Sequence, residues 1–406
     1  MKPLETKNQK TTVDVEKWVY GGDALSRIDG QVLLTPFALP GERIEVEPEG
    51  AKGNLLRARS MQVIEPSPRR VEPQCEYFGR CGGCQYQHAD YAYQIGQKVA
   101  ILRETLRRLG GIAFEDEIPT IAGDPWRYRN RIQLHFDRGR VGFRLHNSHD
   151  LCPITHCPIS SPKLNDAIAV LAGAVKRPGW PRFLRSLELF TNEKEIQLNV
   201  IEADRPVAAR FFTWCAELIP GTVPGALEYQ SAGHTFRISR GAFFQVNRFL
   251  IDALAAEVLG NREGGSVVDL YAGVGLFSLP LATRFARVDA VERGLSAYRD
   301  LETNVAVVAE RVFPARASTE DYLRTLAAPP DAIVADPPRA GLGPEVTAEL
   351  LRIGAPQLTI VSCDPATLAR DLKVLTSLYK IERLALVDLF PQTFHFETVA
   401  HLAVNR

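Results

Sequence analysis

Hydrophobic and polar positions alternate in short runs over residues 11 to about 66, and glycine-containing turns separate the runs. The runs include "TTVDVEKWVY", "GQVLLTPFAL" and "GERIEVEPE". A period of two is typical of strands that bury one face, and several such strands in succession predict a small β-barrel. The segment "EPSPRRVEP" then interrupts regular structure and is interpreted as a linker. We therefore predict an all-β first domain.

The pattern changes twice further along the chain. "YAYQIGQKVAILRETLRRLGGI" has apolar residues at helical spacing and ends in Gly-Gly, which predicts one long helix. Residues from about 125 to 235 mix strands and helices, and from about 236 short apolar strands alternate with longer helices, as in a parallel α/β sheet. We predict a multidomain α/β protein with domains at 1–66, 67–235 and 236–406.

A glycine-bearing loop follows the first buried strand of the last domain. In "SVVDLYAGVGLFSLPLA" the strand ends at Leu270, and Gly273 and Gly275 let the backbone approach a ligand closely. About twenty residues later a second strand ends in Glu292, whose carboxylate can accept both hydroxyls of a ribose. Ser278 stands where a dinucleotide fingerprint needs its third glycine, so the loop fits NAD poorly. The D-L-x-x-G-x-G form resembles the S-adenosylmethionine loop of class I methyltransferases.

Two later strands end in residues that can carry chemistry. "DAIVADPPRAGL" leaves its sheet at Asp336, because the prolines that follow cannot join a ladder. "TIVSCDPATLARDL" ends a strand at Cys363, and a helix starts at Pro365. Ligands bind at the carboxyl edge of such sheets, and a helix N-terminus lowers the pKa of a thiol from about 8.5. We therefore predict Asp336 and a Cys363 thiolate at one edge.

Two flanking segments add polar groups. "RGAFFQVNRFL" places the amides of Gln245 and Asn247 among aromatic residues, which suits the wall of a nucleobase pocket; it also fits a plain helix start. "LFPQTFHFETVAHL" places Glu397 beside Phe396, where partial burial would raise its pKa toward that of a useful base. Taken alone, Glu397 also fits a surface strand.

A thiolate, a carboxylate and a methyl donor together indicate one reaction. Uracil C5 is a poor nucleophile until a thiolate adds to C6, after which C5 can take a methyl group. A base then removes the C5 proton and the thiol is eliminated. The combination therefore favours covalent methylation of a uracil.

Five segments carry a family resemblance. "FFQVN", "VVDLYAGVGLFSLPLA", "DPPRAGL", "SCDPATLARDL" and "FPQTFHFETV" occur in the order found in RNA uracil-C5 methyltransferases. The resemblance implies that Cys363 is the nucleophile and Glu397 the base. It also implies that Asp336 and Gln245 hold cofactor and uracil. The full set of residues implied to bind S-adenosylmethionine is Gln245, Tyr271, Gly273, Glu292, Ser318 and Asp336.

A second group of cysteines lies near the start of the chain. "CEYFGRCGGCQYQH" contains Cys75, Cys81 and Cys84 at C-x5-C-x2-C, a spacing that predicts a metal site. Zinc would accept three thiolates with His88 or a fourth thiolate, whereas a cubane iron–sulfur cluster needs four thiolates. The fourth thiolate would come from Cys157 or Cys152, and spacing alone leaves both the metal and the ligand open.

The same resemblance narrows this choice. The branch of the family with an N-terminal barrel has this spacing and binds a [4Fe-4S] cluster, and its distant ligand resembles Cys157 better than Cys152. By that resemblance the barrel is a TRAM domain, an oligonucleotide-binding-type barrel. For the cluster we favour a structural role over a redox role, which no feature of the sequence supports. Cys215 falls on an apolar helical face and is predicted to be core.

Composition limits the partners. Lys plus Arg equals Asp plus Glu, at 48 each, which argues against a highly basic coat protein but allows a local basic groove. No apolar run approaches the roughly 20 residues of a membrane helix. We expect a cytoplasmic monomer. In "WRYRNR", Arg127, Arg129 and Arg131 would share one face of a strand and hold RNA phosphates, with "SPRR" at 67–70 a weaker candidate.

The sequence therefore predicts an enzyme that makes 5-methyluridine in RNA. Barrel and cluster favour large-subunit (23S) ribosomal RNA over transfer RNA, and the target uridine must be looped or flipped out to reach Cys363. Two rivals stay open: an enzyme that methylates an exocyclic amine, and a non-catalytic iron–sulfur protein that binds RNA.

Overall fold

A computed structural model of the 406-residue chain describes residues 10–52 and 55–405, which form two compact units. Unit 1 comprises residues 1–101, 143–152 and 390–395, and unit 2 comprises 102–142, 153–389 and 396–406. The division into domains at 66 and 235 stays a prediction. No helix of the described part is both long and apolar enough to cross a membrane.

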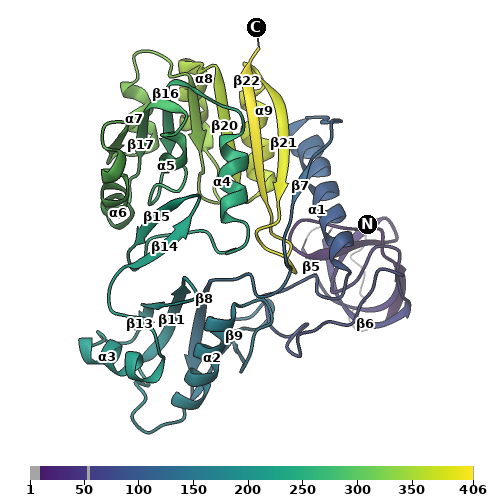
Figure 1. The fold of residues 1–406 in the computed structure, drawn as a ribbon. Coiled ribbons are helices and arrows are strands. Elements are labelled where there is room, and N and C mark those ends of the chain that lie inside the picture. Colours follow the sequence, from purple (N-terminus) through teal and green to yellow (C-terminus); the bar gives the residue numbers. More distant parts are fainter. Residues whose placement is uncertain (1–9, 53–54, 406) are drawn as a thin grey trace. The chain divides into compact units, whose positions relative to one another are not determined.

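Unit 1 is built on a six-stranded sheet, which confirms that the alternating N-terminal segment is all-β (Figure 1). The strand order is β1-β5-β6-β4-β3-β2, and all neighbours are antiparallel except β4 and β6. Its strands are β1 (Thr11–Asp14), β2 (Lys17–Trp18), β3 (Asp23–Ile28), β4 (Gln31–Pro36), β5 (Arg43–Lys52) and β6 (Leu55–Glu65). The sheet buries Trp18, which stacks on Tyr86 with ring centroids 3.9 Å apart.

The long helix predicted after residue 90 is present. It runs as α1 (Tyr91–Thr105) and continues as a π-helical turn, η1 (Leu106–Gly110). Gly111 ends it in a left-handed conformation at φ 68°, which glycine adopts without the steric penalty of a side chain. The short strand β10 (Leu151–Pro153) falls mostly in unit 1.

Unit 2 begins with an α+β layer. Its antiparallel strands follow the order β9-β8-β11-β12, and β13 adds a parallel edge. Helix α2 starts with Pro162 at its first turn and buries residues at helical spacing, as an amphipathic helix does. The elements are β8 (Arg131–Asp137), β9 (Arg140–Arg144), α2 (Pro162–Ala174), β11 (Leu184–Thr191), β12 (Ile196–Ala203), α3 (Ala209–Leu218), β13 (Thr222–Val223) and the hairpin β14 (Leu227–Ser231) with β15 (His234–Ile238).

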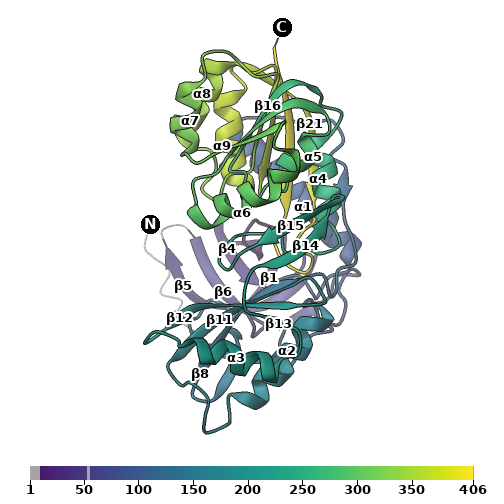
Figure 2. The ribbon, with the colours of Figure 1, turned by 60° about the vertical axis from the view of Figure 1, so that its left-hand side comes forward.

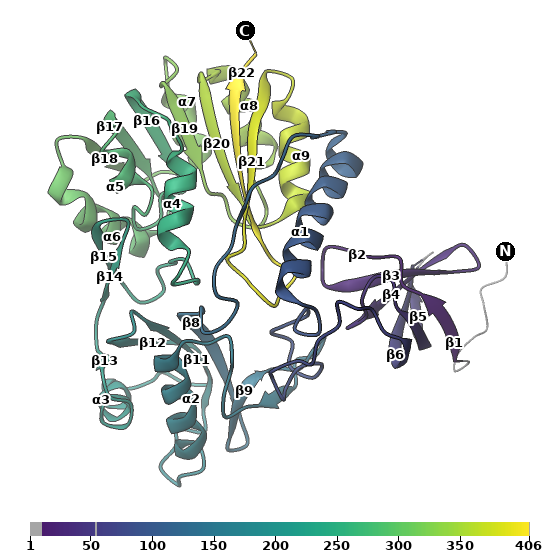
Figure 3. The same ribbon diagram turned by 45° about the vertical axis from the view of Figure 1, so that its right-hand side comes forward.

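The second layer of unit 2 is an eight-stranded sheet in the order β18-β17-β16-β19-β20-β22-β21-β7, which can be followed in Figure 3. Helices α7, α8 and α9 cover one face, and α4 and α5 the other (Figure 2). The strands are β7 (Thr120–Ile121), β16 (Gly264–Leu270), β17 (Phe285–Val291), β18 (Val312–Ala315), β19 (Ala332–Ala335), β20 (Gln357–Ser362), β21 (Tyr379–Val387) and β22 (Glu397–Val404). The helices are α4 (Ile251–Leu259), α5 (Ser278–Leu281), α6 (Leu295–Val305), η2 (Ala306–Val308), α7 (Thr319–Thr325), α8 (Gly343–Ile353) and α9 (Pro365–Leu375).

This sheet positions the predicted site. Strands β16 to β20 are parallel, so their carboxyl ends meet at one edge, and β22 returns antiparallel beside β20. The start of β22 therefore lies at the same edge as the end of β20. The prediction of a parallel α/β sheet is confirmed for β16 to β20.

Candidate active site

Cys363 lies at the carboxyl end of β20, as predicted. It follows Ser362, the last strand residue, and is half-buried. The next residue, Asp364, is the N-cap of α9: its side chain accepts hydrogen bonds from the backbone N–H groups of Ala366 at 2.9 Å and Thr367 at 3.1 Å. The thiol thus lies just outside a helix start whose first N–H groups already have an acceptor.

The register of β20 and β22 brings the two predicted catalytic residues together. The antiparallel pairing runs from Gln357 with Ala403 to Ser362 with Thr398. Continued by one residue, it sets Cys363 opposite Glu397. Side chains at directly opposed positions lie on the same face, with Cβ atoms about 5 Å apart.

Glu397 is a buried acid with a free oxygen. The residue is 6% exposed, and its Oε2 has no hydrogen-bond partner among the described residues. Burial raises the pKa of Glu397 well above the ordinary value, and the nearby Asp336 carboxyl raises it further, while Arg339 opposes the shift. In the free protein this carboxyl is therefore protonated, and it can act as a base only once it has been ionised.

Asp336 completes an acidic edge. It follows β19, whose last residue Ala335 pairs with Ile360 of β20, so it lies at the same sheet edge as Cys363. Burial, followed by repulsion from Asp269, raises the pKa of Asp336 to about 7.

The predicted thiolate is wrong for the free protein. Burial and then the Glu397 carboxyl raise the pKa of Cys363 to about 12, and Arg339 only partly offsets them. The sequence predicted that the N-terminus of α9 would lower the pKa of the thiol, but the N–H groups at that terminus are capped by Asp364. The thiol is therefore protonated at neutral pH.

The glycine loop has the geometry expected of a nucleoside site. Gly273 has φ 57°, and a Cβ added there would meet no atom within 4 Å, so the backbone borders open space at this position. Its N–H donates to Oε2 of Glu292 at 3.0 Å, and Gly294 N–H donates to Oε1 at 2.5 Å. The predicted ribose acceptor is thus fixed at the end of β17, and each oxygen keeps a second lone pair for a ligand.

Asp269 anchors this loop from inside the sheet. It is fully buried, and Ser278 Oγ donates to its Oδ2 at 2.5 Å, which ties the end of β16 to the start of α5. Burial raises the pKa of Asp269 to about 7, and the Glu292 carboxylate adds to the shift. The serine that replaces a third glycine therefore has a structural role.

Tyr271 and Ser318 lie on adjoining loops. Tyr271 has φ 59°, a strained conformation for a residue with a side chain, and its hydroxyl hydrogen-bonds to Thr319 at the start of α7. Ser318 is the N-cap of α7 and accepts a hydrogen bond from Asp321 N–H at 3.1 Å. The cofactor contacts of Tyr271 and Ser318 stay predictions.

The segment around Gln245 is held from two directions. Gln245 is buried, and its carbonyl accepts from Asn130 Nδ2 at 3.2 Å. Asn247 Nδ2 donates to the Leu389 carbonyl at 3.2 Å, so this amide braces the chain ahead of β22. Phe243, by contrast, is 64% exposed beside this segment.

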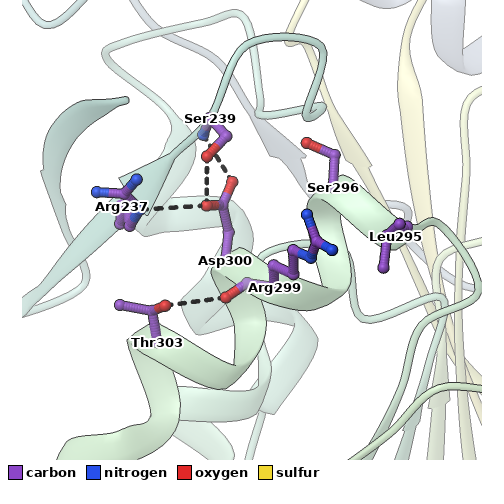
Figure 4. Close-up of a pocket in the computed structure, with 7 residues that line it drawn as sticks. All are labelled: Arg237, Ser239, Leu295, Ser296, Arg299, Asp300 and Thr303. Carbon is purple, nitrogen blue, oxygen red and sulfur yellow. Dashed lines mark hydrogen bonds and ion pairs between the residues drawn. The ribbon is translucent and has the colours of Figure 1, made fainter. Parts of the chain in front are cut away.

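Residues that sequence reasoning missed connect the segment before Gln245 to the glycine loop. Asn304 of α6 donates to the Val274 carbonyl at 2.9 Å and exchanges hydrogen bonds with the backbone of Arg237 in β15. One turn away, Asp300 accepts from the N–H and hydroxyl of Ser239 at 2.6 and 2.7 Å and pairs with Arg237 (Figure 4). In the sequence, the one feature that indicates this connection is an aspartate and an asparagine four residues apart, on the same face of a predicted helix.

The predicted phosphate-binding arginines are mostly structural. Arg131 is buried, pairs with Glu188 at 3.2 Å and lies over the Phe190 ring at 4.2 Å, so the three arginines do not share an exposed strand face. Of the three arginines, only Arg127 is exposed. In unit 1, Arg70 of the weaker candidate "SPRR" binds the buried Glu42 through two hydrogen bonds at 2.5 and 2.7 Å, so its charge is already paired.

The cysteines do not form a metal centre as placed. Among the described residues, no group of three or more His, Cys, Asp or Glu side chains is positioned to hold a metal ion. Cys75, Cys81 and Cys84 belong to unit 1 and Cys157 to unit 2, while the thiol of Cys152 hydrogen-bonds to the Cys81 side chain. Cys215 is core, as predicted, and burial raises its pKa to about 12.

Comparisons with known proteins point to one group of enzymes. The family model described as tRNA (Uracil-5-)-methyltransferase matches residues 328–404, which include β19, β20 and β22. The chain is 30% identical over 437 residues to the 23S rRNA (uracil(1939)-C(5))-methyltransferase RlmD of Hahella chejuensis, covering 97% of each chain. It is 33% identical to RlmD of Dichelobacter nodosus, covering 94% of this chain and 95% of that protein.

A solved structure agrees over the whole chain. The tRNA (uracil-54, C5)-methyltransferase of Pyrococcus abyssi, in complex with S-adenosyl-L-homocysteine, superimposes with a TM-score of 0.77. It is 26% identical to this chain and covers 96% of it and 99% of the Pyrococcus chain.

Proposed function

The chain belongs to the RNA uracil-C5 methyltransferase family, and from that premise we propose that Cys363 and Glu397 methylate a uridine through a covalent adduct. The enzyme transfers a methyl group from S-adenosylmethionine to C5 of a uracil in RNA. The proposal concerns how these side chains do so. The observation that carries it is the β20–β22 register, which sets the thiol beside a buried carboxyl whose Oε2 has no hydrogen-bond partner in the described part of the chain.

The chemistry follows from these two groups. Sulfur of Cys363 adds to C6 of the uracil, and the C5–C6 π electrons move to C5. C5 then forms a bond to the methyl group, whose bond to the sulfonium breaks with its electrons going to sulfur. Glu397 takes the C5 proton, the C5–C6 double bond returns, and the Cys363 thiolate leaves C6.

The Cys363 thiol must release its proton to solvent before its sulfur adds to C6, and the Glu397 carboxyl must likewise be ionised before it can take the C5 proton. Arg339 is the side chain whose positive charge lowers the pKa of Cys363, and the same charge lowers that of Glu397. A bound cation at this edge would act in the same direction, because it favours both anions.

The cofactor fits the residues of the glycine loop. Open space at Gly273, the Glu292 carboxylate at the end of β17 and Asp336 at the end of β19 are suited to a nucleoside with a cationic sulfur. When bound, S-adenosylmethionine supplies the electrophilic methyl group. We propose that Gln245, Tyr271, Gly273, Glu292 and Asp336 hold it, with Ser318 near the adenine.

A mechanism-based trap tests the proposal. 5-Fluorouridine RNA has no C5 proton for Glu397 to remove, so wild-type enzyme and cofactor should yield an adduct that survives SDS. Cys363→Ala should give none, and Cys215→Ala, which removes a core thiol, is the matched control. An active wild-type enzyme without any adduct would exclude the covalent route and favour direct methylation, the reaction type of the exocyclic-amine rival.

For the substrate we propose large-subunit (23S) ribosomal RNA, with transfer RNA as the alternative. Similarity to RlmD over nearly the whole chain supports the first choice, and the tRNA-modifying structural relative supports the second. Nucleoside mass spectrometry of separated rRNA and tRNA from a deletion strain should find 5-methyluridine lost from rRNA. Loss from tRNA alone would reverse the order. We expect the enzyme to act as a cytoplasmic monomer.

A [4Fe-4S] cluster on Cys75, Cys81, Cys84 and Cys157 is proposed from spacing and resemblance alone, as is the TRAM identity of the barrel. The positions of the described thiols do not support the cluster. Anaerobic purification followed by iron and sulfide analysis tests it: about four of each per chain is expected, and Cys157→Ser should lower both. Zinc instead, or a loss with Cys152→Ser only, would contradict this ligand set.

A further inference from the structure

A large cavity lies in the α+β layer of unit 2. The residues that line it come earlier in the sequence than those of the proposed active site. Its wall comes from the loop between α2 and β11, the chain after β12 and the first turns of α3. The volume is about 1280 Å³. That exceeds the roughly 300–1,000 Å³ of small-molecule sites, so the cavity is suited to a segment of a chain. We call it the arginine–tryptophan pocket; its charged and aromatic members are Arg177, Trp180, Arg182, Phe183, Asp204, Arg205, Arg210, Phe211 and Trp214.

Positive charge is concentrated in this pocket. Four arginines line it against one carboxylate, although the chain as a whole is neutral. That carboxylate, Asp204, is already bound by Arg185, with contacts of 2.9 and 2.5 Å. Within the described residues, Arg177, Arg182 and Arg210 have no carboxylate within ion-pair distance, and all three are exposed. The pocket therefore offers unneutralised guanidinium groups to an anion.

Flat aromatic surfaces lie between these charges. The guanidinium of Arg205 already stacks over the Phe183 ring at 4.2 Å. Trp214 is half-exposed, and its ring lies 5.7 Å from Trp180, which is buried against Phe136. The position of Trp214 is thus supported by the packing of Trp180 beneath it. Arginines around an exposed indole suit a strand of alternating phosphates and planar bases.

We propose that the arginine–tryptophan pocket binds a single-stranded segment of the substrate RNA outside the target uridine. Arg177, Arg182 and Arg210 contact phosphates, and one base stacks on Trp214. The inference rests on the proposed function, because it assumes that the polyanion is RNA.

The cavity in Figure 4 does not offer the same combination. Its Arg237 pairs with Asp300, and none of its lining residues is aromatic. Asp300 is committed to Ser239 and Arg237. The two cavities therefore differ in both features that a nucleotide strand needs.

The test compares two double variants of exposed arginines. Arg182→Gln with Arg210→Gln removes two pocket charges, and Arg107→Gln with Arg138→Gln removes two charges elsewhere in unit 2. Binding of fluorescein-labelled oligouridylate is measured by anisotropy over a range of salt. The pocket variant should weaken binding about tenfold and reduce the salt slope by roughly 1.4, at about 0.7 per phosphate of a single strand.

Turnover provides a second readout. With total RNA from a deletion strain, the pocket variant should raise KM and leave kcat unchanged, while the control variant changes neither. Ultraviolet cross-linking should label the peptide that contains Trp214. The inference would be overturned if the pocket and control variants had the same Kd and the same salt slope. It would also be overturned if uridine monophosphate alone displaced oligouridylate, because the pocket would then bind a single nucleotide and not a strand.

Failure of this inference is distinguishable from failure of the proposed function. If the pocket variant weakens binding of oligouridylate but the wild-type enzyme forms no 5-fluorouridine adduct, only the covalent proposal is wrong. If the 5-fluorouridine adduct forms normally and the pocket variant binds like wild type, only the pocket assignment is wrong.

Discussion

The reactivity of Cys363 in the free enzyme is the sharpest quantity that the site predicts. The pKa of its thiol is raised to about 12 by burial and by the Glu397 carboxyl. An ordinary cysteine has a pKa of about 8.5. The perturbation is a change of pH in the absence of RNA and cofactor, which alters the thiolate fraction without changing the chain.

The size of the effect follows from two opposing terms. At pH 7.5 a gap of about 3.5 pKa units makes the thiolate fraction roughly 3,000 times smaller than that of an ordinary thiol. Each thiolate is more nucleophilic when its pKa is higher, with a Brønsted coefficient of about 0.4–0.5, which restores roughly 40-fold. Alkylation should therefore be about 10²-fold slower than for a free thiol, before any steric hindrance.

Iodoacetamide labelling followed by peptide mass spectrometry measures the rate at Cys363 itself, with a short unstructured cysteine peptide as reference and Cys363→Ser as the blank. The rate should rise about tenfold per pH unit up to pH ~9.5, while the reference levels off near its pKa of about 8.5. A Cys363 profile that levels off at or below that point would mean that the free enzyme holds a thiolate. The electrostatic account of the site would then be wrong.

Three further changes test other parts of unit 2. Glu397→Gln should lower turnover about 10²–10⁴-fold and let the adduct with ordinary RNA accumulate, whereas Glu382→Gln, an exposed acid on β21, should do neither. The pKa of Asp269 is raised to about 7, so its contribution to stability is complete below about pH 4 and is lost as pH rises through about 7. In urea unfolding, Asp269→Asn should therefore flatten the pH slope over that window by up to about 1.4 kcal/mol per unit; an unchanged slope would contradict the shift. Asn304→Ala removes the side-chain hydrogen bonds to the Val274 carbonyl and to the β15 backbone, and should lower the free energy of unfolding by about 2–4 kcal/mol. Binding of S-adenosylmethionine, measured by calorimetry, should also become weaker. An unchanged affinity would show that the glycine loop keeps its shape without Asn304.

Local pattern predicted the elements of the site because each has a local signal. The glycine loop, the proline exit after Asp336 and the strand–helix junction at Cys363 are all legible within about ten residues. The closeness of Cys363 and Glu397 is not, since it depends on β22 returning beside β20 across 34 intervening positions of chain. The family resemblance supplied that pairing, and the register provides its physical reason.

The two wrong assignments of arginines to RNA share one cause, which is a partner distant in sequence. Arg131 was assigned to RNA because its neighbours are basic and aromatic, but Glu188 on β11 binds it. Arg70 was assigned on similar grounds, and Glu42 binds it in unit 1. A charge run specifies which residues could meet an anion, and only the tertiary fold decides which of them are already paired.

The thiol of Cys363 shows the same limit in its electrostatics. Asp269, Asp336, Glu397 and Cys363 meet around one sheet edge, and burial is the first cause of the raised pKa of each. Repulsion from another member of this group raises the pKa of Asp336, Glu397 and Cys363 further. For Asp269 the added repulsion comes from Glu292. The free protein therefore favours the neutral forms, and a cation bound at this edge would favour the anions by the same electrostatics. The charge state that catalysis needs is thus a property of the complex, which is why a motif of a few residues around one cysteine could not predict it.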